Sequence, residues 1–282
     1  MKKEKISLIT CTYNRLDKLE KLIKSLKNQS LLPDEFIVSD DGSKEDIEFF
    51  LKNIFKNENR FKVKLIKQSD LGFRLARARN NGVREAIGEL IILIDSDIVM
   101  PKKFIEIFYK KRQKNVINLS RALRLTPENT KLLTCKEIEE ENYSHLYSKK
   151  SYYYNIERYY KNKLYSIFAP KKQAEKFRAM AFSLYKEDYI KLNGFDENFI
   201  GWGAEDLDFG RRAYYKGIKI VNSHKNNFQI HQWHEESDKN DDYSLKYFRK
   251  IWEEREKSKN YDIEYGILKS YQNDKYEVIE IC

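Results

Sequence analysis

Short apolar runs alternate with amphipathic segments along the first third of the chain. Residues 6–10, 35–39 and 61–66 are apolar stretches of strand length that end in polar turns. The segments 16–26 and 47–54 carry apolar residues three and four positions apart, which is the spacing of an amphipathic helix. Strands that alternate with helices in this way predict a parallel sheet covered by helices.

The most apolar run, residues 90–94, ends at Asp95-Ser96-Asp97. Five aliphatic residues without a charge predict a strand that is buried on both faces, in the middle of a parallel sheet. Asp95 and Asp97 share one face of an extended chain, so both should point into the crevice at the carboxyl ends of the strands, where open α/β sheets bind ligands. Neighbouring carboxylates repel unless a cation lies between or beside them, which predicts Mg²⁺ or Mn²⁺. The alternative is an acidic turn after a core strand, because so short a motif often occurs by chance.

Regular patterns are less frequent after residue 101. A polar, Tyr-rich segment over 121–176 predicts a helical or loop-rich insertion. Its tyrosines suit the faces of sugars, although packing of the insertion on the sheet is the favoured interpretation for most of them. The other elements expected in this part are a helix at 104–108, strands at 116–119, 177–184 and 217–221, a turn at 193–199 and a helix at 243–259.

Three arginines, Arg74, Arg77 and Arg79, lie near the start of a helix expected over 72–82. The free amides and the dipole of a helix N-terminus favour negative charge, so these arginines are candidates for binding anionic oxygen. The alternative is a basic helix face in contact with solvent.

Acids follow a tryptophan between glycines, Gly201-Trp202-Gly203, and the first turn of the next helix contains Glu205, Asp206 and Asp208. Carboxylates are stabilised at that position, so helix capping is one explanation. A tryptophan between two flexible residues and beside acids also suits an apolar platform with a general base next to it.

Two of the four histidines, His231 and His234, are close together near the end of this pattern. A neutral imidazole could complete the coordination of a metal held by Asp97. The alternative is a pair of loop histidines without a ligand role.

The chain is basic, with a net charge of +10 and a pI near 9.1, and its mean hydropathy is −0.76. Such charge suits nucleic acid, an anionic membrane surface or a phosphorylated small molecule, but the lysines are interleaved with glutamates, so an ordinary polar surface is the favoured reading. No apolar run has the length of a membrane span, no signal peptide is visible, and three scattered cysteines argue against a disulfide framework or a zinc site. We expect a cytoplasmic protein, with peripheral contact at an anionic inner membrane face as a hypothesis.

Several of these motifs together resemble the family 2 glycosyltransferases with the GT-A fold. The resemblance rests on Thr12-Tyr13-Asn14, Asp40-Asp41-Gly42-Ser43, Arg79-Asn80-Asn81-Gly82 and the Asp-x-Asp pair at Asp95 and Asp97, and it covers about residues 5–235. The later run from Gly201 to Asp206, with Asp208 and Arg211, resembles the C-terminal motif of β-1,4-galactosyltransferases and chondroitin-polymerase-type enzymes.

This resemblance implies a GT-A domain over residues 1–236, with a Rossmann-like, mostly parallel central sheet flanked by helices. Residues 121–176 would then be an insertion in the acceptor region, and residues 237–282 a charged, helical C-terminal extension.

For the site, the resemblance implies an inverting, metal-dependent transfer from a UDP-sugar to a hydroxyl group. The nucleotide and sugar would contact Thr12, Asn14, Asp41 (at the uracil), Arg74, Asp95 (at the ribose or donor sugar), Ser96 and Trp202. Mn²⁺ or Mg²⁺ would be held by Asp97 and His231, with His234 as a substitute for His231. Asp206 would be the general base, and Glu205 would bind the acceptor.

The expected acceptor is a glycan of a capsule, a lipopolysaccharide or another surface polysaccharide, with lipid-linked and peptide acceptors as alternatives. Two other classes of protein stay open at this point. A metal-dependent nucleotidyltransferase also needs an Asp-x-Asp at a strand end but leaves the Gly-Trp-Gly run unexplained. A non-enzymatic nucleic-acid-binding protein is disfavoured because the basic residues are dispersed, so no nucleic-acid partner is expected. The donor sugar is not identified.

Overall fold

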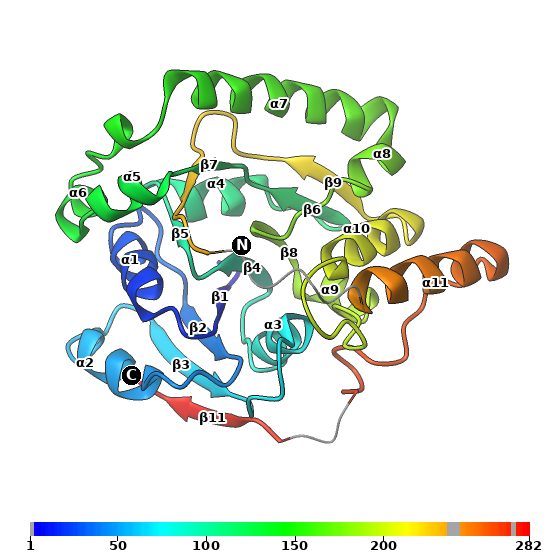
Figure 1. Ribbon diagram of the computed structural model, residues 1–282, viewed down its shortest axis with the longest axis horizontal. Helices are drawn as coiled ribbons and strands as arrows, with labels where there is room; N and C mark the ends of the chain where they lie inside the picture. Colours follow the sequence, from blue (N-terminus) through cyan, green and yellow to red (C-terminus); the bar gives the residue numbers. More distant parts are fainter. Residues whose placement is uncertain (1–2, 236–242, 272–274) are drawn as a thin grey trace.

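The structure, a computed structural model, describes residues 3–235, 243–271 and 275–282. An eight-stranded sheet crosses the molecule in the order β11-β3-β2-β1-β4-β8-β6-β9 (Figure 1). Strands β3, β2, β1 and β4 are parallel neighbours, as are β6 and β9, whereas β8 and β11 run antiparallel to their neighbours. The strands are β1 (Ile6–Thr12), β2 (Glu35–Asp40), β3 (Lys62–Lys67), β4 (Leu90–Asp95), β6 (Val116–Leu119), β8 (Ala181–Tyr185), β9 (Lys219–Asn222) and β11 (Glu277–Glu280).

Strand β4 lies inside the sheet and is buried on both faces, as its apolar run predicts. Ile92 and Ile94 point into one core, and Ile91 and Leu93 point into the core on the other face. Full burial of each such side chain contributes about 1.5–3 kcal/mol, so the strand is anchored from both sides.

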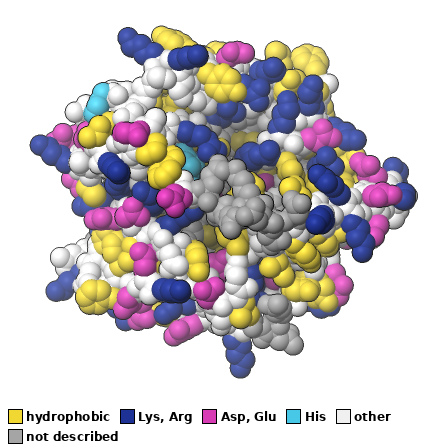
Figure 2. Space-filling view, viewed as in Figure 1, with side chains coloured by type: hydrophobic (Ala, Val, Ile, Leu, Met, Phe, Trp, Pro, Cys, Tyr) yellow, Lys and Arg dark blue, Asp and Glu magenta, His cyan; other side chains and the backbone are white. Residues whose placement is uncertain are grey.

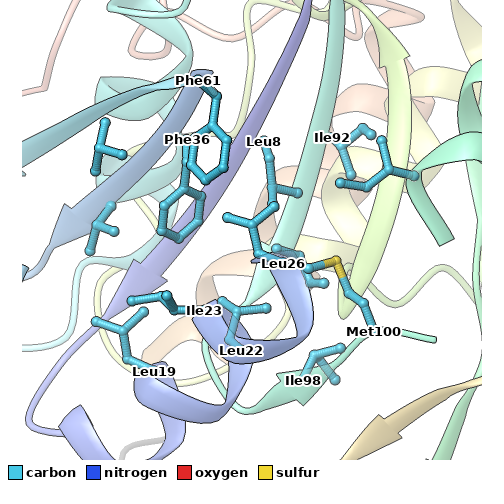
Figure 3. Packing of buried hydrophobic residues seen from close by; sticks show 14 of the residues in the cluster. Leu8, Leu19, Leu22, Ile23, Leu26, Phe36, Phe61, Ile92, Ile98 and Met100 are labelled. Carbon is cyan, nitrogen blue, oxygen red and sulfur yellow. The ribbon is translucent and has the colours of Figure 1, made fainter. Parts of the chain in front are cut away.

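Helices cover both faces of this sheet. Apolar residues of α1, α2 and α4 belong to the first core, and residues of α3, α8, α9 and α10 belong to the second. Figure 3 shows Leu22 and Leu26 of α1 beside Leu8 and Met100 in the first core, which confirms the helical spacing of its leucines. The α-helices are α1 (Leu16–Lys27), α2 (Ile47–Ile54), α3 (Leu75–Arg84), α4 (Phe104–Lys111), α5 (Pro127–Leu132), α6 (Cys135–Glu139), α7 (Lys149–Phe168), α8 (Pro170–Ala174), α9 (Lys186–Lys191), α10 (Glu205–Tyr215) and α11 (Tyr243–Ser258), and a short 3₁₀ helix, η1, spans Ser144–Leu146.

A small second sheet was not anticipated by the sequence pattern. It has the order β5 (Ile98–Val99), β10 (Gln229–His231) and β7 (Ala122–Arg124), with β10 antiparallel to β5 and parallel to β7. Strands of two or three residues are too short to show an alternating pattern. Their pairing places His231 opposite Ile98, the residue that follows Asp97.

The segment that was expected to be helical or loop-rich contains α5, α6, η1, α7 and α8. The strand expected at 177–184 begins only at Ala181. Phe177 and Ala179 are buried in the second core before the strand starts, so their apolar character reflects packing and not sheet pairing.

The C-terminal extension is helical only in part. Residues 237–242 lie outside the described residues, and α11 follows them, but the chain then returns to the main sheet. Strand β11 pairs with β3, and Ile279 and Ile281 pack against the first core. The helix expected at 243–259 is thus present as α11, whereas the strand β11 was not expected.

Within the described ranges, no helix combines the length and the apolar character that are needed to cross a membrane.

Candidate active site

A cavity of about 690 Å³ opens at the carboxyl ends of β1, β2 and β4. These strands are parallel neighbours, so the residues that follow them meet at one edge of the sheet. Nine of the residues singled out from the sequence line this cavity, namely Thr12, Asp41, Asp95, Ser96, Asp97, Trp202, Asp206, His231 and His234. Asn14, Arg74 and Glu205 are not among the residues that line it.

Asp97 and two histidines form a compact group in which a metal ion could be held. One ligand atom from each of Asp97, His231 and His234 lies within 4.8 Å of the others. Asp97 Oδ2 is 3.0 Å from His234 Nε2, and Asp97 Oδ1 is 3.7 Å from His231 Nε2. The structure thus brings both histidines to Asp97, with His234, the reserve candidate, nearer to it than His231.

Charges around Asp97 keep its carboxylate ionised. Burial alone would raise the pKa of Asp97, but the hydrogen bond with His234 and the nearby charges of His231 and Arg15 lower that pKa below its usual value. The hydrogen bond with Asp97 raises the pKa of His234, whereas burial lowers that of His231.

The donor set fits a divalent cation. Asp97 Oδ1 is buried and has no hydrogen-bond partner among the described residues, which leaves one carboxylate oxygen available as a ligand. Carboxylate oxygen suits Mg²⁺ and Mn²⁺, and imidazole nitrogen favours the transition metal of the two. Arg15 Nη1 donates to the other oxygen, Asp97 Oδ2, at 3.1 Å.

A second group of charges surrounds Arg79 of α3. Its guanidinium lies 3.2 Å from a carboxylate oxygen of each of Asp95, Glu205 and Asp206. Arg79 is buried, and its aliphatic and aromatic surroundings include the ring of Phe195, 4.8 Å from the guanidinium carbon. The Arg79 guanidinium therefore joins residues of β4 and α10 that are more than a hundred positions apart in the chain.

The expectation for the three arginines of α3 needs correction. Arg74, Arg77 and Arg79 are all buried, so they do not form a solvated basic face. Arg79 is engaged by three carboxylates, which removes it as a free binder of anionic oxygen. The main-chain amide of Arg74 donates to Asp41 Oδ2 at 2.8 Å, so Arg74 supports the cavity wall through Asp41.

Asp206 and Glu205 are neighbours in α10 but have different surroundings. Asp206 lines the cavity, and its Oδ2 accepts a hydrogen bond from the Ala179 amide at 3.1 Å while Oδ1 contacts Arg79. Glu205 is buried behind it, and burial together with the adjacent Asp206 charge raises the pKa of Glu205 to about 8. Asp206 thus faces the cavity, whereas Glu205, buried behind it, is held mostly protonated at neutral pH.

Asp41 and Asn14 are two of the residues predicted to contact the nucleotide, and the structure gives them different surroundings. Its carboxylate accepts hydrogen bonds from the Gln68 side chain and from the Arg74 amide, and burial raises the pKa of Asp41 to about 6. Asn14 instead supports the neighbouring loop, because its amide donates to Ser43 Oγ and its Oδ1 accepts from the Lys44 amide, both at 2.8 Å.

The loop before α10 explains the glycines around Trp202. Gly201 and Gly203 have φ angles of +86° and +94°, in the left-handed region that glycine adopts without a steric cost. Ala204 also has a positive φ of +69°, directly before the acids of α10. This backbone turns the half-exposed Trp202 ring towards the cavity, where it forms part of the wall.

Asp208, the third acid of the run, has a structural role. Its carboxylate is fully buried and accepts hydrogen bonds from Arg212 Nε at 2.7 Å, from Trp252 Nε1 at 3.1 Å and from Arg255. Two of these partners belong to α11, so Asp208 joins α10 to the C-terminal helix and not to the cavity.

Sequence reasoning missed several residues of the cavity wall. Arg15 directly follows the Thr12-Tyr13-Asn14 motif, and Trp233 lies between the two histidines, so proximity to known motifs could have identified both. Arg124 falls in the polar segment 121–176, and Arg178 falls in the stretch expected to be a strand at 177–184; in neither place does a pattern mark these arginines as cavity residues.

Comparison with known proteins identifies the fold and the class of enzyme. Residues 7–157 match the family described as glycosyl transferase family 2. The chain belongs to this family. Residues 162–235 match a second family, described as the N-terminal domain of galactosyltransferase, and the boundary falls within α7. The family that its motifs resemble is therefore confirmed.

Curated relatives share about a quarter of their residues with this chain. Validoxylamine A glucosyltransferase of Streptomyces hygroscopicus subsp. limoneus is 26% identical over 236 residues, which cover 77% of this chain and 49% of the relative. Chondroitin synthase of Pasteurella multocida (strain Pm70) is also 26% identical, over 75% of this chain and 23% of the relative. The chain thus spans half the length of these relatives or less.

Solved structures confirm the GT-A fold. TarS of S. aureus in complex with UDP-GlcNAc superposes with a TM-score of 0.60 at 18% identity, over 88% of this chain and 64% of that one. The mannosyltransferase PcManGT from Pyrobaculum calidifontis, in complex with GDP-Man and Mn²⁺, gives a TM-score of 0.58 at 15% identity, over 88% of this chain and 61% of that one. At such low identity, these likenesses establish the fold alone.

Proposed function

We propose that this glycosyltransferase moves a hexose or an N-acetylhexosamine from a UDP-sugar to a hydroxyl group of a glycan, with inversion at the anomeric carbon and with a divalent cation. The observation that carries the proposal is the presence, in one cavity, of the group Asp97, His231 and His234 together with the carboxylate of Asp206. The first group suits a cation beside a diphosphate, and the second suits a base beside an acceptor hydroxyl.

The residues of the cavity divide between the nucleotide and the sugars. Thr12 and Asp41 would contact the nucleoside, Asp95 would face the ribose or the donor sugar, and Trp202 would present its ring to a sugar face. Asp97, His231 and His234 would hold Mn²⁺ or Mg²⁺, and two imidazoles favour Mn²⁺. When bound, this cation neutralises negative charge that develops on the UDP leaving group.

Asp206 would act as the general base. Its carboxylate takes the proton of the acceptor hydroxyl as the hydroxyl oxygen forms a bond to C1, and the bond from C1 to the UDP oxygen breaks with its electron pair leaving on UDP. Attack from the face opposite the leaving group inverts C1, so an α-linked UDP-sugar gives a β-glycoside. Arg79 and the Ala179 amide donate hydrogen bonds to Asp206 and would orient it for this step.

The choice of donor rests on the nucleotide sugars bound in the structural neighbours and on the names of the curated relatives. One structural neighbour is a complex with UDP-GlcNAc and another a complex with GDP-Man, and the curated relatives include a glucosyltransferase and chondroitin synthases. UDP-sugars are therefore the first donors to test, and GDP-mannose is the first alternative. Chondroitin synthase among the relatives supports a polysaccharide acceptor.

The test is release of the nucleoside diphosphate from a panel of UDP-hexoses, UDP-N-acetylhexosamines and GDP-mannose, each with Mn²⁺, Mg²⁺ or EDTA. We expect metal-dependent hydrolysis of one UDP-sugar that falls at least about a hundredfold in Asp97→Asn. Asp206→Asn should retain the thermal shift caused by UDP and Mn²⁺ while losing transfer to an acceptor. Asp262→Asn, whose side chain is exposed, is the matched control and should behave as the wild type.

Two outcomes of this panel would contradict the proposal. If GDP-mannose is the only nucleotide sugar that is turned over, the donor is GDP-mannose and not a UDP-sugar. Condensation of a sugar 1-phosphate with a nucleoside triphosphate, without hydrolysis of any nucleotide sugar, would replace the proposal with nucleotidyl transfer.

A further inference from the structure

In helix α7 (Lys149–Phe168), Tyr152 and Ile156 pack on a core cluster, but the buried residues are polar and most apolar side chains of the second half are exposed, unlike those of an ordinary surface helix. Its buried residues are Asn155 and Asn162, and Asn155 Oδ1 accepts a hydrogen bond from Arg121 Nε at 2.9 Å. Its most exposed large side chains are Phe168 at 79%, Tyr153 at 67%, Ile167 at 61% and Leu164 at 56% exposure. Packing against the rest of the protein does not explain these apolar residues.

The exposed apolar residues form one stripe. Tyr153, Tyr160, Leu164 and Ile167 recur at intervals of seven, four and three positions, which places them on one face of a helix, and Phe168 extends this face by one position. The buried asparagines lie on the opposite face, towards β7 and β9, which are the strands that α7 contacts. In Figure 1, α7 runs along one outer edge of the molecule, with no other element beyond it.

Positive charge surrounds this stripe. Between residues 149 and 176 there are eight Lys or Arg and two Glu, so about a tenth of the chain carries six of its ten net positive charges. Lys149, Lys150, Lys161 and Lys163 are exposed on α7 itself, and in Figure 2 basic and hydrophobic side chains alternate along the same edge. Lys172 and Lys176 add further charge, at 5.2 and 4.6 Å from the Tyr165 ring centroid.

We infer that α7 is the surface on which this protein docks on an anionic phospholipid bilayer. A helix with aromatic and aliphatic side chains on one face and lysines beside them lies in the membrane interface, with the apolar face among the upper acyl chains and the ammonium groups at the lipid phosphates. Each Lys or Arg near such a surface adds electrostatic attraction to the anionic lipids.

The observations favour a bilayer over other occupants of this face. A second copy of the chain would bring two strongly basic stripes together, which like-charge repulsion opposes. A nucleic acid would suit the lysines and tyrosines, but it offers no apolar phase for Leu164, Ile167 and Phe168.

The docking surface lies close to the cavity. Helix α7 packs on β7, and Arg124 of β7 is part of the cavity wall. The docking surface and a part of the cavity wall therefore belong to neighbouring elements. If the proposed function holds, an acceptor carried in the membrane would be held next to the element that contributes Arg124 to the wall, whereas the docking itself does not depend on that function.

The test is sedimentation of the full chain with vesicles, at low salt and without any nucleotide sugar. We expect binding to vesicles of phosphatidylglycerol and phosphatidylcholine in equal parts, and little binding to phosphatidylcholine alone. The variant Leu164→Ser/Ile167→Ser/Phe168→Ser should bind the anionic vesicles at least about tenfold more weakly. Lys161→Glu/Lys163→Glu should also weaken binding, and raised salt should weaken the wild type.

The matched control is Phe49→Ser/Leu268→Ser, which removes two equally exposed apolar residues from elsewhere on the surface and should bind vesicles as the wild type does. All variants should retain the melting temperature and the donor hydrolysis of the wild type, since the changed residues are exposed and outside the cavity. No binding to anionic vesicles, or equal binding by the serine variant, would overturn the inference. Self-association of the wild type that the serine variant abolishes, without vesicle binding, would assign the stripe to a second copy instead.

Discussion

Single residues near the cavity gain their properties from neighbours that are distant in the chain. One guanidinium, that of Arg79, lies against the carboxylates of Asp95, Glu205 and Asp206. Glu205 is the buried member of the three, and burial together with the adjacent Asp206 charge raises its pKa to about 8. Arg79 is therefore a positioning residue that ties Asp95 to the proposed base, Asp206.

The raised pKa of Glu205 predicts a pH-dependent effect of Glu205→Gln on stability. The folded-state pKa lies above the unfolded value of about 4.5, so the neutral form favours folding, and this contribution is lost as pH rises from about 4.5 through 8. Glutamine resembles the neutral acid and does not titrate. We expect the melting temperature of Glu205→Gln, relative to wild type, to rise by several degrees between pH 5 and pH 9, since each pKa unit corresponds to about 1.4 kcal/mol.

Thermal unfolding at these pH values measures this difference. Glu254→Gln, on the exposed face of α11, is the control, and the difference between its melting temperature and that of the wild type should be the same at every pH. A difference that is also independent of pH for Glu205→Gln would mean that Glu205 is ionised in the folded protein at neutral pH.

At the scale of elements, the contacts of α11 and β11 hold the C-terminal part of the chain against the glycosyltransferase fold. Helix α11 is tied to α10 through the buried Asp208, and β11 extends the sheet beyond β3. Neither contact reaches the cavity, so changes there should affect stability more than catalysis.

Asp208→Asn tests the first of these contacts. The substitution removes the charge that compensates Arg212 and Arg255, and loss of one partner from a buried ion pair costs about 3–5 kcal/mol. We expect a loss of this size in the free energy of unfolding measured with urea, with the KM for the donor unchanged where the variant is folded. A loss below about 1 kcal/mol would show that water or Asp196 compensates the two arginines; Asp262→Asn is the exposed control.

Ile279→Asp and Val278→Asp form a matched pair in β11. Side chains of neighbouring strand residues point to opposite faces, and Ile279 packs on the first core whereas Val278 is 40% exposed. Urea unfolding should show a loss of about 1–3 kcal/mol for Ile279→Asp and less than about 0.5 kcal/mol for Val278→Asp. Equal effects would mean that β11 contributes only through its backbone pairing.

At the scale of the whole molecule, the cavity is assembled from both halves of the chain. Asp97 follows β4 in the segment that matches glycosyl transferase family 2, and His231 and His234 lie in the segment that matches the galactosyltransferase domain. A cation bound between them would link the two segments, so its binding should stabilise the entire fold.

Thermal unfolding in a titration with Mn²⁺ tests this linkage. At a hundred times its dissociation constant, a ligand adds about 2.7 kcal/mol, or several degrees in melting temperature, and EDTA should reverse the shift. His231→Ala and His234→Ala should each raise the Mn²⁺ concentration of half-maximal shift by at least about tenfold. His145→Ala, an exposed histidine outside the cavity, should leave it unchanged. If only one of these two variants raises the Mn²⁺ concentration of half-maximal shift, the histidine replaced in the other variant is not a ligand.

The sequence by itself determined the succession of strands and helices up to β4, the acidic end of β4, and the identity of nine of the 19 residues that line the cavity. Apolar periodicity and strand ends are local properties, so they are visible in the order of the residues. Only the tertiary structure decided that Arg79 faces three carboxylates, that Asp208 serves α11 while its neighbour Asp206 faces the cavity, and that β5, β7, β10 and β11 exist as strands. These outcomes depend on contacts between residues that are far apart in the chain, and strands of two to four residues acquire their conformation from the partner to which they bond.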